Sequence, residues 1–400
     1  MPISTEFSQI VGSENLSMLK EESPLSRKTR ADVHRAVSIL FDSFQQTLER
    51  ATIPWKRRGR IMKIVRLPGD APPPDDRSPS KLISINLLVI VSDPRLVRYA
   101  THWAQAEAML AREFNDNPDS CTNFYFVVHG APYVRKHLKR NEAFFADILS
   151  GGETLFDTGE LAFKAGVLHT TRTAVLAMKD EYERRMAAAE RRVNAARWEL
   201  GQAKHSAAWR VDAAFSLHQA VERLYEALLN VTKNHCPSSH NLGQLRSLSE
   251  ASVPDLSACW NVKADDEAVF RKLDRAYRDA RYAERFKITD AQIEVIFDRT
   301  DRLMARVKTA CKSCLQLKMA EAILAEIPTV TRCIFLACCV DGYSYPMISE
   351  VTGHSVERIE RFVGRALAYI HKGHRSAEMQ KLEQLDGDGW LPFANPSGAS

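Results

Sequence analysis

The 400-residue sequence has no apolar run of the roughly 20 residues that a membrane-spanning helix needs. The segment Met1–Lys20 contains Glu6 and Glu14 and has no apolar core, so we expect no secretory signal peptide. Cysteine is scarce, with eight residues scattered along the chain, which is typical of reduced thiols in a cytosolic protein. These absences argue against membrane-spanning and disulfide-stabilised secreted classes, and we expect a cytoplasmic protein.

The spacing of the cysteines does not indicate a metal site. Cys311 and Cys314 form one CxxC pair, and Cys333, Cys338 and Cys339 follow. A structural zinc site needs a second, correctly spaced pair of ligands, and none is evident. We therefore expect no metal and no cofactor, and we interpret these cysteines as small apolar residues on helices.

The overall composition is that of a globular protein with more than one domain. Hydrophobic residues make up 45% and charged residues 26% of the chain. A chain of 400 residues is too long for one ordinary core, so two or three domains are expected. The net charge of +5 permits a nucleic-acid partner without requiring one.

Strand signals are confined to the first part of the chain. The runs Ile61–Val65, Leu82–Val91 and Phe124–His129 are apolar or β-branched, and they alternate with helical patterns such as Arg95–Phe114. This alternation predicts a small α/β domain over residues 28–165.

Helical periodicity dominates the remainder of the sequence. We predict a helical bundle over residues 170–314 and a second helical module over residues 317–373. The polar ends suggest a disordered lead over residues 1–27 and a mobile tail over residues 374–400. The expected fold class is mainly α with a small N-terminal α/β domain.

Two segments of the α/β domain carry a resemblance to a known fold. The sequences Arg60–Gly69 and Leu87–Asp93, supported by Trp55–Arg60 and Phe145–Leu149, resemble the nucleotidyltransferase fold of bacterial nucleotidyltransferase–HEPN proteins over about residues 30–165. In that family a D-x-D pair on one strand holds Mg²⁺, because residues i and i+2 of a strand share a face.

The resemblance does not extend to the charged groups of that family. Ser84 and Asn86 stand at the D-x-D positions, and the family's Gly-Ser turn reads Pro68-Gly69 here. The third carboxylate of the family lies on a strand that here runs Tyr125-Phe126-Val127. The resemblance therefore implies the loss of metal-dependent transfer, and it leaves open nucleotide binding, protein binding or a purely structural role.

Three motifs in the predicted bundle occur in a recognisable order: His218–Tyr225, Ser239–Leu242 and Ala276–Tyr282. Together they resemble a HEPN domain over about residues 205–312. Ser239 is expected to be the N-cap of its helix. The spacing of His218, Glu222 and Tyr225 places them on one helical face.

Nuclease members of the HEPN superfamily use an Arg and a His four to six residues later, since histidine exchanges protons near neutral pH. Neither Arg278 nor Arg281 is followed by a histidine at that distance. We therefore assign no catalytic residue and expect a protein that is not an enzyme. The residues His218, His240, Arg278 and Arg281 form a candidate nucleotide or phosphate pocket; the alternative is a set of salt bridges within the bundle.

The last module combines a turn at Asp341-Gly342, a short helix Tyr345–Val351 and a glycine turn at Gly353. This order, following a leucine-rich helix with Pro328 near a bend, resembles region four of extracytoplasmic-function sigma factors. That region is a helix-turn-helix that reads an upstream promoter element.

The second helix of this module is predicted to begin after Ser355 as its N-cap. Helical spacing turns the apolar residues inward and the basic ones outward. The resemblance implies that the outward residues contact DNA in the major groove and its phosphates. The candidate DNA-binding residues are Ser355, Arg358, Arg361, Arg365 and Lys372. Glu357 and Glu360 on the same helix oppose phosphate contact, and a protein-interaction module is the alternative.

The leading functional hypothesis is a DNA-binding transcriptional regulator that acts on promoter-like DNA, with RNA polymerase as a further partner. Its HEPN-like and nucleotidyltransferase-like modules would sense a nucleotide ligand or form a homo-oligomer. The alternative from another class is a toxin–antitoxin or defence protein that acts on RNA or nucleotides. A third hypothesis is a scaffold protein without a nucleic-acid role.

Overall fold

The computed structural model describes residues 27–68, 83–117, 120, 122–139, 143–161, 171–237, 239–260, 266–282 and 286–374. The expected disordered lead and mobile tail lie outside the described residues, apart from Arg27 and His374. The chain divides into two compact units. We call residues 1–168 with 181–311 the sheet–bundle unit and residues 169–180 with 312–400 the C-terminal unit, and each is described by itself.

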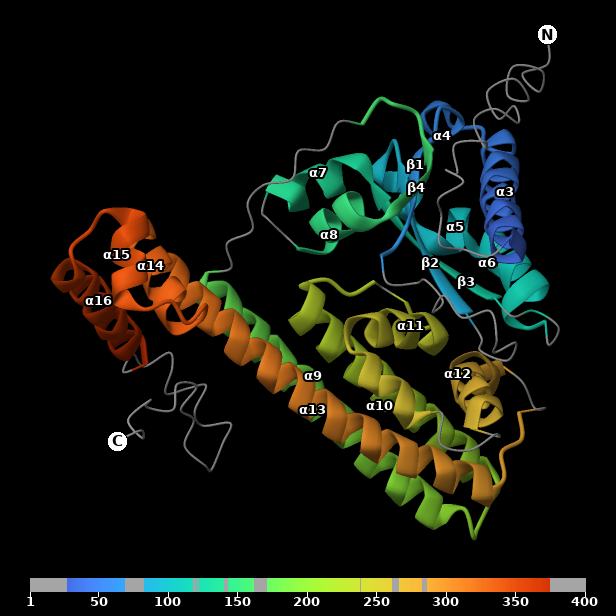
Figure 1. Ribbon diagram of the computed structural model, residues 1–400. Coiled ribbons are helices and arrows are strands. Elements are labelled where there is room, and N and C mark those ends of the chain that lie inside the picture. The colour runs from blue at the N-terminus through green and yellow to red at the C-terminus, as the bar shows by residue number, and fades with distance from the viewer. Residues whose placement is uncertain are drawn as a thin grey trace. The chain divides into compact units, whose positions relative to one another are not determined.

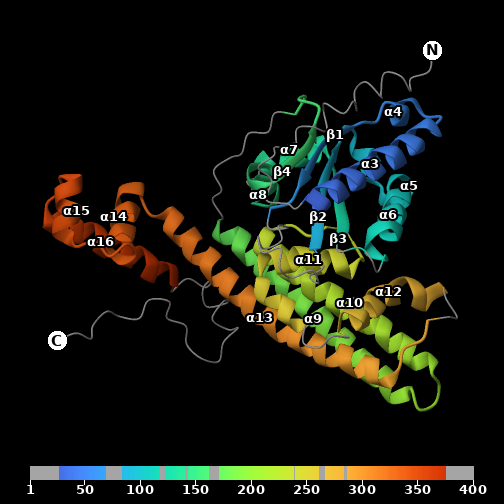
Figure 2. The same ribbon diagram turned by 45° about the vertical axis from the view of Figure 1, so that its right-hand side comes forward.

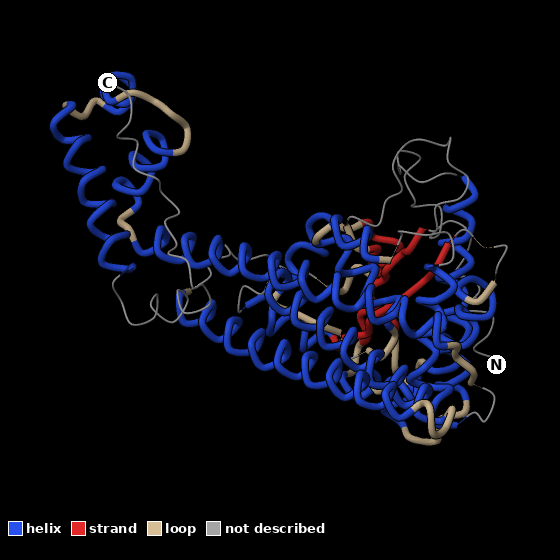
Figure 3. Tube along the Cα trace, turned by 90° about the horizontal axis from the view of Figure 1, so that it is seen from below, coloured by secondary structure: helices blue, strands red, loops and turns tan. Residues whose placement is uncertain are grey.

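The sheet–bundle unit begins with a four-stranded sheet and its helices (Figure 1). In chain order its elements are α3 (Arg27–Glu49), α4 (Pro54–Arg57), β1 (Ile61–Arg66), β2 (Ile83–Val91), η1 (Pro94–Val97), α5 (Tyr99–His102), α6 (Ala104–Leu110), η2 (Ala111–Asn115), β3 (Thr122–Gly130), α7 (Ala131–Lys139), α8 (Ala143–Gly151) and β4 (Glu153–Asp157). Figure 3 shows the strands gathered in this one place, while the other described elements are helices.

The helices that follow are longer. They are α9 (Arg172–Gln202), α10 (Ala208–Lys233), α11 (Leu242–Ser252), η3 (Pro254–Cys259), α12 (Asp266–Tyr282), α13 (Asp290–Glu326), α14 (Thr329–Cys339), α15 (Tyr345–Thr352) and α16 (Val356–His374). The predicted fold class, mainly α with a small N-terminal sheet, is confirmed. No described helix is both long enough and apolar enough to traverse a bilayer.

The sheet has the order β3-β2-β1-β4. β2 and β3 are parallel, with Ile83 opposite Thr122 and Val91 opposite Gly130. β1 runs antiparallel to both of its neighbours. The apolar β2 sequence is buried over seven consecutive residues, as expected for a central strand that is covered on both faces.

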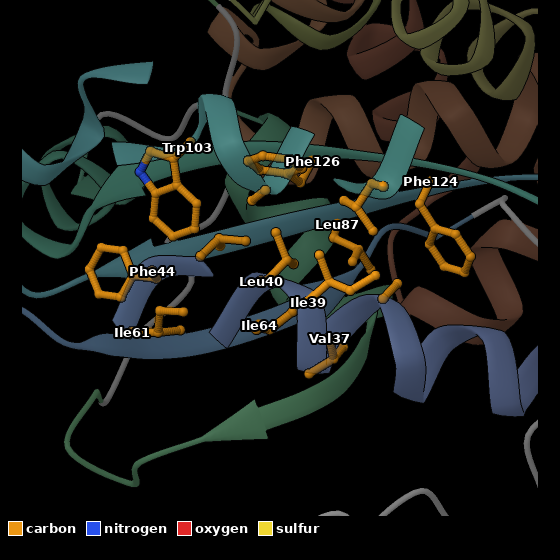
Figure 4. Close-up of a cluster of buried hydrophobic side chains, with 14 of the residues drawn as sticks. Val37, Ile39, Leu40, Phe44, Ile61, Ile64, Leu87, Trp103, Phe124 and Phe126 are labelled. Atoms are coloured by element: carbon orange, nitrogen blue, oxygen red, sulfur yellow. The ribbon is translucent and has the colours of Figure 1, made fainter. Parts of the chain in front are cut away.

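Helix α3 covers one face of the sheet. Its residues Val37, Leu40 and Phe44 pack against strand residues such as Ile64 and Leu87 (Figure 4). The ring of Trp103 stacks on Phe44 with a centroid separation of 4.8 Å. The Trp103 indole N–H donates to the Leu96 carbonyl at 2.8 Å, so this buried donor is satisfied within the core.

One prediction for this region was wrong, and one strand was not predicted. Arg95–Phe114 was expected to be one helix. The backbone is instead extended at Arg98 (φ −61°, ψ 106°), and the segment forms η1, α5, α6 and η2. Strand β4 was not predicted because it is a short edge strand with one fully buried apolar side chain, Leu155. Its charged ends pair with β1, through Lys63–Asp157 at 2.7 Å and Arg66–Glu153 at 2.8 Å.

The bundle is built on the antiparallel pair α9 and α13, which lie side by side in Figures 1 and 2. Arg197 pairs with Asp301 at 2.9 Å, and Glu190 pairs with Lys308 at 2.7 Å. Helix α13 continues without a break from Asp290 to Glu326. The predicted boundary at residues 314–317 therefore lies inside this helix, close to residues 311–312, where the two compact units divide.

Helix α11 lies against β2 and β3, on the opposite side of the sheet from α3. The Asn86 side-chain amide donates to Ser247 Oγ at 2.7 Å, and the Gln244 amide donates to the Phe126 carbonyl at 2.9 Å. A Cβ atom at Gly243 would lie 2.3 Å from the Tyr125 hydroxyl oxygen. The helix therefore approaches the sheet at a distance that only glycine permits at this position.

The start of α11 corrects one capping prediction. Asn241, not Ser239, is the N-cap, because its side-chain oxygen accepts from the Gln244 backbone N–H at 3.0 Å. The Ser239 hydroxyl accepts from the Asn241 N–H one step earlier in the loop. A further donor of the first turn, Leu242 N–H, bonds to the Asp274 carboxylate of α12 at 2.6 Å.

The C-terminal unit contains α14, α15 and α16. Buried Ile334, Phe335, Ile348, Ile359 and Val363 form its apolar interior. The leucine-rich stretch Ile323–Leu336, expected to carry a bend at Pro328, is instead divided there: α13 ends at Glu326 and α14 begins after Pro328. Proline cannot donate the backbone hydrogen bond that would continue the helix.

Two histidines, half-buried His129 and buried His235, connect the sheet to the end of α10. His129 is the penultimate residue of β3, His235 follows α10, and their ring centroids are 5.1 Å apart. His235 also stacks on Phe144 at 4.1 Å. Burial and the charge of neighbouring His137 lower the pKa of His129 to about 4. Burial, with the charges of His129 and His137, lowers the pKa of His235 to about 3. Both imidazoles are therefore neutral in the folded protein near neutral pH.

We predict that stability falls as the pH drops below 6.5, where unfolded histidine takes up a proton and the folded His129 and His235 do not. Each histidine contributes a loss of about 1.4 kcal/mol per pH unit until the pH nears its folded pKa. Urea unfolding between pH 7 and pH 5 measures this slope. His235→Phe should make it shallower, exposed His205→Phe should not change it, and identical slopes for wild type and His235→Phe would refute the assignment.

Candidate functional site

The C-terminal unit presents a basic stripe on α16. Arg358, Arg361, Arg365 and Lys372 all have exposed side chains. At about 100° per residue these four positions fall within about 60° of the helix circumference. The buried residues Ile359, Val363, Ala366 and Ile370 occupy the opposite side. The outward placement predicted for the three arginines is what the structure has, and we call these four residues the basic stripe.

The turn before α16 is tight. Gly353, which ends α15, has φ +69°. This is a left-handed backbone conformation that is sterically unfavourable for residues other than glycine. Ser355 immediately precedes α16, and its carbonyl accepts from the Arg358 and Ile359 N–H groups. Glu357 is exposed in the first turn, where a hydrogen bond with Ser355 lowers the pKa of its carboxyl.

A second group of polar side chains gathers inside the sheet–bundle unit, from two helices and one loop. His218 and Glu222 are one turn apart on α10, His240 lies in the loop before α11, and Tyr277 comes from α12. His240 Nδ1 is 3.0 Å from Glu222 Oε2, and His218 Nδ1 is 4.0 Å from the same oxygen. The Tyr277 ring stacks on His240 at 4.4 Å and on His218 at 5.4 Å.

Burial divides these four residues into an inner and an outer part. The side chains of His218 and Glu222 are 0% and 1% exposed, whereas the His240 side chain is 57% exposed. Burial raises the pKa of the Glu222 carboxyl, and its hydrogen bond and charge interaction with His240 oppose this rise. A buried carboxylate thus holds an imidazole whose ring reaches solvent.

One hydrogen bond couples the two groups. When Glu222 is ionised it can only accept, and His240 Nδ1 then donates the proton of this bond. The other nitrogen, Nε2, is then the ring atom that can take up a proton from a bound molecule.

Residues 182–310 match the family model of the HEPN domain. No curated protein matches the sequence.

The HEPN domain confirms the resemblance that the three motifs predicted, and all three lie within the matched residues. The match begins in α9, before the three motifs and within the predicted helical bundle of residues 170–314. The predicted phosphate pocket is brought together only in part. The His218 side chain has no exposed surface, and it contacts the Tyr277 ring and Glu222. The Arg278 and Arg281 side chains lie outside the described residues.

Glu222 and Tyr277 belong to this cluster, and the sequence analysis assigned neither of them to the pocket. Glu222 is the charged one of the two. Its i,i+4 spacing from His218 was the available signal, because a carboxylate one turn from a histidine on a buried face requires a partner. That partner, His240, lies in a loop 18 residues further along the chain, and spacing alone does not reveal such a contact.

Proposed function

We propose that the chain is a DNA-binding transcriptional regulator in which α15 and α16 form a helix-turn-helix. The exposed basic stripe on α16 carries this proposal. In such a motif the second helix enters the major groove, with some side chains at base edges and others at phosphates. With 19 residues, α16 is about 28 Å long, enough to extend from base edges to the flanking phosphates.

The two glutamates of α16 do not interrupt the basic stripe. At about 100° per residue, Glu360 lies about 130° around the helix from the centre of the stripe, and Glu357 about 70°. A helix that directs the stripe toward DNA therefore turns Glu360 away from it. Glu357 remains at the border of the contact surface, where a carboxylate can accept from cytosine.

We propose that the sheet retains a nucleotidyltransferase-like fold and has no metal-dependent activity. Asn86 stands where that family has a carboxylate, and its amide is bonded to Ser247 of the HEPN domain. An uncharged, buried amide that is bonded in this way cannot replace the anionic oxygen that Mg²⁺ requires. In the regulator that we propose, the sheet–bundle unit would serve as the sensory or oligomerising part.

Fluorescence anisotropy with a labelled DNA duplex of mixed sequence tests the DNA proposal. The intact protein should bind, and the affinity should fall steeply between about 50 and 200 mM salt, because binding releases counterions from the phosphates. Replacing Arg358, Arg361 and Arg365 with Gln should abolish most binding and make the plot of log K against log salt shallower by about one unit per lost phosphate contact.

A charge-matched control separates direct contact from net charge. Replacing the exposed Arg112, Arg191 and Arg192 of the sheet–bundle unit with Gln also lowers the net charge from +5 to +2. This control variant should keep the affinity to within a few-fold. Equal losses in both variants, or no salt-dependent binding by the wild type, would rule out α16 as the reading helix.

The pair formed by His240 and Glu222 favours a second candidate function, action on RNA. HEPN domains are typical of RNases and toxin–antitoxin proteins, and a carboxylate-held imidazole can serve as a general base. The two functions differ in a measurable way. If the HEPN domain cleaves RNA, His240→Gln should reduce the rate about 10²- to 10⁴-fold.

An RNA-cleavage assay with the intact protein decides between the candidates. The regulator that we propose predicts no cleavage that depends on His240 or Glu222, with His205→Gln as the control for an exposed histidine elsewhere. Cleavage that is lost in His240→Gln and in Arg281→Ala, but kept in His205→Gln, would give priority to the RNA function.

A further inference from the structure

A cavity of about 350 Å³ opens beside the sheet in the sheet–bundle unit. It is lined by Thr47, Arg50, Lys56, Thr101, His102, Ala104 and Gln105. These residues come from the end of α3 and from α4, which precede β1, and from α5 and α6, which follow β2. Ile61 at the start of β1 pairs with Val91 at the end of β2. All four segments therefore meet at the same end of these two central strands.

This end of the sheet is distinct from the surface that α11 covers. Asn86, near the start of β2, contacts the HEPN domain, whereas the cavity follows the carboxyl end of β2. In open α/β sheets, ligands bind outside the carboxyl ends of the strands. The parallel pair β2 and β3 gives this sheet such an end, and the cavity lies where the connection after β2 begins.

The lining is basic and contains no carboxylate. Arg50 and Lys56 make no ion pair with a described residue. Glu49, the neighbour of Arg50 in sequence, is hydrogen-bonded to Gln45. Arg57, the last residue of α4, and Arg58, which follows it, are exposed. Arg50 and Lys56 thus give the cavity a positively charged lining that the DNA-binding proposal does not use.

A buried histidine supplies a second, independent observation. The His102 side chain lines the cavity and is only 3% exposed, and its Nδ1 has no hydrogen-bond partner among the described residues. A buried polar atom without a partner is costly, and it is explained when a ligand provides the partner. His102 also shares this cavity with two cations that would attract an anionic ligand.

We propose that this cavity binds a small molecule through its phosphate group, with Arg50, Lys56 and His102 as the phosphate ligands. Arginine and lysine form the strong charge-assisted hydrogen bonds that phosphate oxygens accept. Thr47, Thr101 and Gln105 supply neutral hydrogen-bonding groups for the rest of the ligand. The volume lies at the lower end of the range for small-molecule sites, about 300 to 1,000 Å³, which suits a nucleoside monophosphate better than a larger cofactor.

Isothermal titration calorimetry of the full chain tests the site, with inorganic phosphate, AMP and adenosine as separate probes at constant ionic strength. We expect phosphate and AMP to bind and adenosine not to bind. Tighter binding of AMP would identify a nucleotide ligand, and equal binding would identify free phosphate. Lys56→Gln and Arg50→Gln should each weaken binding about tenfold or more, the usual effect of losing one charge-assisted contact.

Matched controls keep this test separate from the DNA proposal. Exposed Arg112→Gln should bind the probes like wild type, and so should the variant with Gln at Arg358, Arg361 and Arg365. If that last variant loses phosphate binding while Lys56→Gln keeps it, the anion site is on α16 and the cavity proposal fails. Absence of any phosphate or AMP binding at millimolar concentration also overturns it.

A pH series with sulfate, which does not titrate near neutral pH, examines His102 directly. Burial, Lys56 and Arg98 lower the pKa of His102 in the free protein, and Arg50 lines the same cavity. A bound dianion should favour the protonated ring, so sulfate binding should take up a proton and strengthen as the pH falls from 8 to 6. His102→Gln should remove this pH dependence; a dependence that persists would exclude His102 as a ligand.

Discussion

The contact of α11 with the sheet is the constraint on which the sheet–bundle unit depends. Asn86 and Gln244 are buried amides, and each makes a hydrogen bond across this contact, to Ser247 Oγ and to the Phe126 carbonyl. Such groups must be paired to be tolerated inside a protein. Gly243 allows the backbone of α11 to approach Tyr125. The sheet and the HEPN domain therefore satisfy one another's buried polar groups through α11.

The position of α11 also determines the geometry of the polar cluster. Asn241 and Asp274 of α12 accept hydrogen bonds from the first turn of α11. These bonds fix the position at which the preceding loop joins the helix. That loop brings His240 to Glu222 and against Tyr277. The C-terminal unit has its own apolar interior, so the basic stripe on α16 is formed by local helix periodicity. The two candidate surfaces thus have different structural origins.

Much of this could be predicted from the sequence, where the signal was periodic. The apolar run of β2 and the inward Ile359 and Val363 of α16 were identified because alternation and helical spacing are local properties. The edge strand β4 escaped prediction because only Leu155 is fully buried. The cap of α11 was placed at Ser239 instead of Asn241, since both residue types are good caps. The pairing of His240 with Glu222 depends on how helices from distant segments pack, which no local pattern encodes.

A double-mutant cycle with Asn86→Ala and Ser247→Ala tests this dependence most directly. Urea unfolding of the wild type, the two single variants and the double variant gives the coupling free energy between the two side chains. A buried hydrogen bond at 2.7 Å predicts a coupling of about 1 kcal/mol, with the double variant less destabilised than the sum of the single ones. Strictly additive effects would show that α11 and the sheet do not depend on one another through this contact.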